Sequence, residues 1–167
     1  MAGFTYDIEC LLSDLETILT TKLGPKLTAI AAEKTGINKA LDLPLPAADD
    51  YYFQTWDDAI LNSSPAILYG LRESAAEGVG PATAERITAF VEVYFTNPIN
   101  EIDDGSGVRR ILRYTRAIKE IIQENFDENS ILSKLKVKTI TPLSFRLEED
   151  TSNEIKVGGV ELETSLV

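Results

Sequence analysis

The sequence contains no histidine, one cysteine and one methionine in 167 residues. Without histidine, the chain lacks the commonest general base and the commonest metal ligand of proteins. The single cysteine, Cys10, cannot form an internal disulfide, so nothing in the sequence requires an oxidising compartment. The motifs of phosphate-binding loops, serine hydrolases and zinc peptidases are also absent. These absences argue against most classes of enzyme and of metalloprotein.

Long apolar runs are missing as well. No stretch of about 18 apolar residues occurs, which argues against a transmembrane helix. Residues 1–20 include four acidic residues and lack the charged start and apolar run of a secretory signal peptide. We therefore expect a protein that is made in the cytoplasm and has no membrane among its partners.

Acidic residues are the remaining candidates for chemistry, because several of them are adjacent in the sequence. The groups are Asp49 and Asp50, Asp57 and Asp58, Asp103 and Asp104, and Glu148 to Asp150. Adjacent side chains of a strand point to opposite faces, and those of a loop are usually solvated. None of the groups has the alternating spacing of a calcium-binding loop. We therefore expect no catalytic, metal-binding or cofactor-binding residue.

The balance of charge is strongly negative, with 16 Lys plus Arg against 27 Asp plus Glu and a net charge of -11. Such a surface repels phosphate backbones, which argues against general nucleic-acid binding. The length suits one domain with its own core. We expect a single domain over 1–167, with long loops at about 35–50, 57–65, 74–84 and 97–107.

Apolar periodicity predicts the elements of the first two thirds of the chain. Residues 6–30 have apolar side chains three and four residues apart, which predicts an amphipathic helix that is interrupted or bent near Gly24-Pro25. Aromatic and aliphatic runs predict strands at 51–56 and 66–73. The segment 85–97 alternates between apolar and polar residues, which predicts a half-buried strand.

A second helix is predicted over 106–126, with Ser106 or Asp104 as its N-cap. This segment has five basic and two acidic residues, unlike the rest of the chain. Arg109, Arg113 and Arg116 lie four and then three residues apart and form a stripe beside the apolar face, and Arg110, next to Arg109, is counted with this arginine stripe. Three interpretations remain open. The first is that the stripe is a solvated face with an Arg116–Glu120 ion pair. The second is that it binds acidic groups of another copy, and the third is that it contacts DNA.

The last third of the chain predicts two more strands. The segment 134–147 alternates, with Lys134, Lys136 and Lys138 on one face and Pro142 in the same phase, which is typical of an edge strand. The segment 154–167 changes phase at Gly158-Gly159; a β-bulge is favoured, and a tight hairpin is the alternative. The predicted fold is α+β, a mostly antiparallel sheet of four to five strands packed against an N-terminal helix and a central helix.

The order of these elements resembles that of a known family. The chain is expected to run from an N-terminal amphipathic helix through a three-strand meander with long loops to the helix RRILRYTRAIKEIIQENF. A closing pair of strands follows and ends in IKVGGVELETSLV. From about Tyr6 to Leu166, this arrangement resembles the tail terminator proteins of tailed bacteriophages.

The resemblance implies a non-enzymatic structural protein of the virion tail or neck. Proteins of this family form a ring, usually a hexamer, that caps the tail tube and joins it to the head connector, while DNA passes through the lumen without specific binding. The implied partners are other copies of the chain, the tail tube protein and the head connector protein. The long loops of this chain depart from the family and suggest a contact with a tail sheath. The alternative is another neck or baseplate adaptor with a similar core.

The ring hypothesis assigns roles to three sets of charged residues. The arginine stripe is the expected subunit interface, and the strand edge marked by Lys134, Lys136 and Lys138 is a possible site for strand pairing with a tail partner. Two acidic loops are candidates for the lumen or the axis of the ring. Their acidic residues are Glu101, Asp103, Asp104, Glu148, Glu149 and Asp150.

Overall fold

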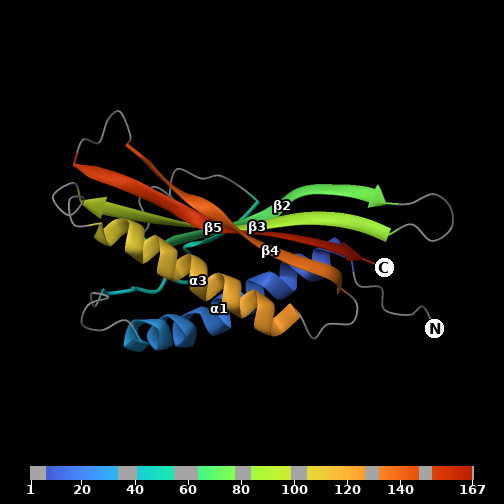
Figure 1. Cartoon of the computed structure of the whole chain (residues 1–167), viewed down its shortest axis with the longest axis horizontal. Helices are drawn as coiled ribbons and strands as arrows, with labels where there is room; N and C mark the ends of the chain where they lie inside the picture. The colour runs from blue at the N-terminus through green and yellow to red at the C-terminus, as the bar shows by residue number, and fades with distance from the viewer. Residues whose placement is uncertain are drawn as a thin grey trace.

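The protein has two layers, a sheet and a pair of helices that both lie on one face of it (Figure 1). The computed structural model describes residues 7–33, 41–54, 64–77, 84–98, 105–126, 132–146 and 152–166. Within these residues the helices are α1 (Ile8–Glu33) and α3 (Ser106–Phe126). The sheet has five strands in the order β1-β2-β3-β5-β4. The predicted α+β class, with an N-terminal and a central helix against a mostly antiparallel sheet, is confirmed.

One strand pairing differs from the predicted meander. Strand β1 (Tyr51–Phe53) pairs with β2 (Ala66–Glu77) in parallel, whereas the other three pairings are antiparallel. Strand β1 is also shorter than predicted, because Gln54 turns out of it with a φ of 55°. The amide side chain of Gln54 then continues the ladder: its Oε1 accepts from the Leu71 N–H at 2.6 Å, and its Nε2 donates to the Leu71 carbonyl at 2.8 Å.

Helix α1 runs without a break through Pro25, so the predicted interruption is wrong. Proline costs a helix one hydrogen bond and some distortion. That cost is offset here because leucines on both sides of Pro25, including Leu23 and Leu27, are fully or almost fully buried. The helix begins after Asp7, whose Oδ1 accepts from the Cys10 N–H at 3.0 Å. This hydrogen bond holds the pKa of Asp7 below its usual value.

Helix α3 lies directly on the sheet, with its apolar face against β5 (Asn153–Leu166). It starts one residue earlier than an N-cap at Ser106 requires. Gly105, at a φ of 71°, precedes the helix, and its carbonyl accepts from the Arg109 N–H at 3.1 Å. Ser106 is therefore the first helical residue, and the prediction that it is the N-cap is wrong.

Strand β5 has its apolar residues at odd positions before Gly158-Gly159 and at even positions after it, because the two halves bury opposite faces of the sheet and not because of a hairpin. Strand β5 pairs with β3 (Ala84–Pro98) in one unbroken register. Val160 and Leu162 belong to the main core under the helices, whereas Ile155 belongs to a smaller cluster on the other face. The hairpin alternative is wrong, and β5 carries no bulge against β3. The first half of β5 therefore buries its apolar residues on the face away from the helices, and the second half buries them under the helices.

The register shifts lie in the neighbouring edge strand, β4 (Leu132–Phe145). Thr141 and Pro142 together oppose the single residue Gly158, and a similar shift lies between Ser133 and Lys136. The prediction of an edge strand with a proline is confirmed, since β4 ends the sheet. Two loop predictions are wrong in part: in 74–84, residues 74–77 extend β2 and Ala84 belongs to β3, and in 97–107, residues 97–98 belong to β3 and 106–107 to α3.

Candidate interaction surfaces

The arginines predicted to form one stripe have four different environments. Arg109 is exposed, and no ion pair joins it to another described residue. Arg110 lies over the ring of Phe95 at 5.4 Å from its centroid, and its Nε donates to the Asp42 carbonyl at 3.3 Å. Arg113 is only 6% exposed. Burial lowers the pKa of the Arg113 guanidinium, and the nearby charge of Arg109 lowers it further.

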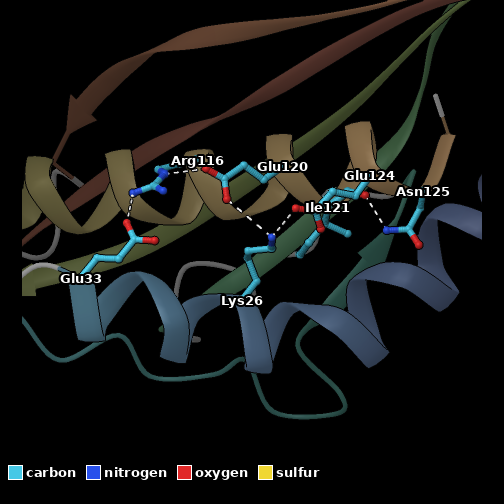
Figure 2. Close-up of polar contacts among 7 residues, drawn as sticks. All are labelled: Lys26, Glu33, Arg116, Glu120, Ile121, Glu124 and Asn125. Atoms are coloured by element: carbon cyan, nitrogen blue, oxygen red, sulfur yellow. Dashed lines mark hydrogen bonds and ion pairs between the residues drawn. The ribbon is translucent and has the colours of Figure 1, made fainter. Parts of the chain in front are cut away.

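Arg116 joins the two helices. Its Nη1 lies 2.8 Å from Glu33 Oε2 on α1, and its Nε lies 2.6 Å from Glu120 Oε1 on α3 (Figure 2). Hydrogen bonds to Glu33 and Glu120 raise the pKa of Arg116. The expected Arg116–Glu120 pair is therefore confirmed. Because the guanidinium is engaged within the chain, Arg116 contributes to the fold and offers less charge to a partner.

Lys26 extends this set of contacts along α1. Its Nζ lies 2.5 Å from Glu124 Oε1 and 3.6 Å from Glu120 Oε2, as Figure 2 shows. The hydrogen bond to Glu124 raises the pKa of Lys26. We name the set of Lys26, Glu33, Arg116, Glu120 and Glu124 the interhelix clamp. It joins the last part of α1, from Lys26 to Glu33, to the segment of α3 from Arg116 to Glu124.

The outer face of α3 combines one cation with two apolar side chains. Val108 and Leu112 are 38% and 46% exposed, and Arg109 lies beside them. Residues four apart are neighbours on a helix surface, so the three side chains form one patch. We name these three residues the α3 ridge. The apolar spacing of the segment 106–126 includes Val108 and Leu112, but both side chains are exposed in the structure.

A groove lies between the first half of α1 and the β1–β2 end of the sheet. Its volume is about 620 Å³, and its floor is apolar. The residues that line it include Ile8, Glu9, Leu12, Glu16, Tyr51 and Phe53. Phe53 is 51% exposed although it is aromatic. We name this site the α1 groove. No local sequence pattern indicates this groove, because its walls come from segments about 40 residues apart.

Acidity marks the rim of the α1 groove. Glu9 and Glu16 are both exposed on α1. The phenol of Tyr69 also lines the groove, next to Glu16. Burial, with a smaller effect of Glu16, raises the pKa of Tyr69 to about 12, so this phenol stays neutral and can donate a hydrogen bond. The groove therefore offers apolar contact together with negative charge.

At the strand edge of Lys134, Lys136 and Lys138, one of the lysines forms an ion pair within the sheet. Lys138 Nζ lies 2.7 Å from Glu163 Oε1 on β5, and this bond holds the pKa of Glu163 below its usual value. Lys136 is exposed, and the side chain of Lys134 lies outside the described residues. Between the two register shifts, an uninterrupted edge remains only over residues 136–140. Strand pairing with a tail partner at this edge stays a prediction.

The acidic residues expected at the lumen or the axis all lie outside the described residues: Glu101, Asp103, Asp104, Glu148, Glu149 and Asp150. Among the residues that are described, no cluster of three or more acidic or cysteine side chains could hold a metal ion. Neither described helix has the length and apolar content to cross a membrane.

Two buried polar residues near the start of α3 were not predicted. Lys156 is 7% exposed, and its Nζ lies 2.9 Å from Glu154 Oε2 and donates to Ser144 Oγ at 2.6 Å. Asn97 is fully buried, and both polar atoms of its amide lack a hydrogen-bond partner among the residues described.

Comparison with known proteins assigns no family. The sequence matches no protein-family model and has no significant match among curated proteins.

Proposed function

We propose that this protein is a non-enzymatic structural component of a phage virion, which forms a ring at the end of the tail tube and joins the tail to the head connector. The observation that supports the proposal is the order of its elements. A long N-terminal helix, three strands, an arginine-bearing helix and two closing strands follow one another in the structure. This is the order on which the resemblance to tail terminators rests, although β1 and β2 are parallel and not a meander.

The surfaces of the protein suit assembly better than chemistry. The described helical layer exposes an apolar ridge with a cation and a groove with an acidic rim. Exposed apolar side chains next to charges are typical of surfaces that bind other proteins. The net charge of -11 also suits a lumen through which DNA passes without binding.

Tail length is the property that tests the proposal. Tails assembled without this protein are expected to have uncontrolled lengths, because nothing stops growth of the tube. Electron micrographs of a deletion phage measure this directly. Tails of normal length that fail to attach to heads would support the alternative, a neck or baseplate adaptor. A supply of the protein from a plasmid should restore the normal length, which controls for effects on neighbouring genes.

Self-assembly provides a second test that needs only the purified protein. Rings are expected in electron micrographs of the protein alone or mixed with its tube protein, and their mass should be a multiple of 18.4 kDa. A protein that remains a monomer in both samples would count against the ring.

A further inference from the structure

The α3 ridge and the α1 groove have complementary chemistry. The ridge offers two exposed aliphatic side chains, Val108 and Leu112, beside the cation Arg109. The groove offers an apolar floor that includes Phe53 and a rim with Glu9 and Glu16. Each surface exposes the kind of apolar area that the other would cover, and their charges are opposite. Contacts of this kind combine burial of apolar surface with charge pairs at the rim.

The overall charge of the chain limits which surfaces of two copies can meet. At a net charge of -11, copies repel one another over the range of about 8 Å that physiological salt allows. A stable contact therefore needs a local cation on one copy opposite carboxylates on the other. In the described helical layer, Arg110 and Arg116 are bound within their own chain, whereas Arg109 extends from the ridge without an ion pair.

The two surfaces lie at different places on the molecule. Helix α3 begins at the left end of the helical layer in Figure 1, whereas α1 begins toward the right end. The ridge is in the first turns of α3, and the groove is along the first half of α1. One copy therefore has room for a neighbour at each end. A contact between two different patches is heterologous, and repetition of it produces a ring or a filament and not a two-fold dimer.

We propose that the α3 ridge of one copy binds in the α1 groove of the next. Leu112 and Val108 lie against the apolar floor near Phe53, and Arg109 pairs with Glu16 or Glu9 on the rim. This inference rests on the proposed function, because it names the subunit contact of the ring. The groove has a volume within the range of about 300–1,000 Å³ that is typical of small-molecule pockets, so a small apolar ligand is the competing occupant.

Cross-linking of two single-cysteine chains tests the contact. In a Cys10→Ser background, one chain carries Leu112→Cys and the other carries Phe53→Cys. A short bismaleimide should join the two chains in the mixture and should join neither chain to itself. A chain with both substitutions should give a ladder of covalent multimers. Cross-linking of Leu112→Cys to itself would indicate a two-fold contact and would overturn the proposal.

Charge exchange provides an independent measurement. Arg109→Glu and Glu16→Arg should each weaken self-association by at least about tenfold, because each places like charges in contact. Both substitutions in one chain should restore association, since the pair is then reversed but still complementary. Lys136→Glu is the matched control: it changes the net charge by the same amount as Arg109→Glu, at an exposed site on β4. Equal effects of Arg109→Glu and Lys136→Glu would contradict a specific contact.

The two proposals fail separately. Electron micrographs of the cross-linking samples report on rings, whereas the covalent bond reports on this contact. Rings without the Leu112–Phe53 cross-link overturn the contact and leave the proposed function standing. The cross-link in samples that contain filaments or short chains of subunits supports the contact and counts against a ring. Samples with neither rings nor the cross-link overturn both proposals.

Discussion

Gly158 of β5 lies directly against Ile111 and Thr115 of α3, and Gly158→Ala should destabilise the protein. A Cβ at this position would overlap Ile111 Cγ2 and would lie 3.1 Å from Thr115 Oγ1. Ile111 is fully buried, so its side chain has little space to turn away. Overpacking of this kind costs about 1–3 kcal/mol. With a urea dependence of about 1–3 kcal/mol/M, the unfolding midpoint should fall by about 1 M.

A double-mutant cycle identifies the cause. Ile111→Ala alone should cost about 2–5 kcal/mol, because it leaves a cavity in the core. In the double variant, the new methyl group fills part of that cavity. The double variant should therefore be destabilised by about 0.5–3 kcal/mol less than the sum of the two single variants. Additive costs would refute the reasoning, as would an unchanged midpoint for Gly158→Ala.

Gly24→Ala is the matched control for that experiment. A Cβ at Gly24 would lie 3.2 Å from Leu45 Cδ1, and Leu45 is 55% exposed and able to move. Alanine is better than glycine in a helix interior by about 0.5–1 kcal/mol. Because the ring of Pro25 crowds a Cβ on the residue before it, part of this gain is lost, and Gly24→Ala should change stability less than Gly158→Ala does.

Three further predictions concern the core, the clamp and alkaline pH. Thr115→Val should raise the free energy of unfolding by up to about 1 kcal/mol, because the buried Thr115 Oγ1 has no hydrogen-bond partner within the described part of the chain. A lower midpoint in urea unfolding would contradict this. Lys26→Met should cost about 0.2–1 kcal/mol, and the cost should shrink in about 1 M NaCl if it comes from the ion pairs with Glu120 and Glu124. Tyr69, with its pKa raised to about 12, stays protonated in the native state while unfolded tyrosine ionises near about pH 10. The stability that Tyr69 contributes through this pKa shift is therefore complete below about pH 10 and is lost as the pH rises toward 12. The urea midpoint should be lower at about pH 11 than at about pH 8, and Tyr69→Phe should reduce that difference.

Local patterns were sufficient for the elements that bury one regular face. Strand β3 alternates without a break, and its alternate residues from Ile87 to Phe95 are buried in the core under the helices. The order of elements and the proline-marked edge strand also followed from the sequence. These features depend on periodicity and on the missing N–H of Pro142, which act within a few residues.

Features that depend on distant partners could not be read from the sequence. Residues 74–77 have the letters SAAE, which do not favour a strand, yet they extend β2 because they pair with the start of β3. The parallel pairing of β1 and the burial of Arg113 are of the same kind. The α1 groove combines α1 with β1 and β2, so no local pattern could indicate it.

The interhelix clamp has a consequence for the size of any closed assembly. The α3 ridge and the α1 groove belong to different helices, so the orientation of one relative to the other depends on how α1 packs against α3, through the buried core and through the contacts of Lys26 and Arg116 with their glutamates. If ridge binds groove, that orientation is the angular step from one copy to the next, and the step determines how many copies complete a circle. Contacts inside a single chain would then determine the number of subunits in the ring. Substitutions that loosen the clamp would give rings of several diameters, and the subunits would still bind one another.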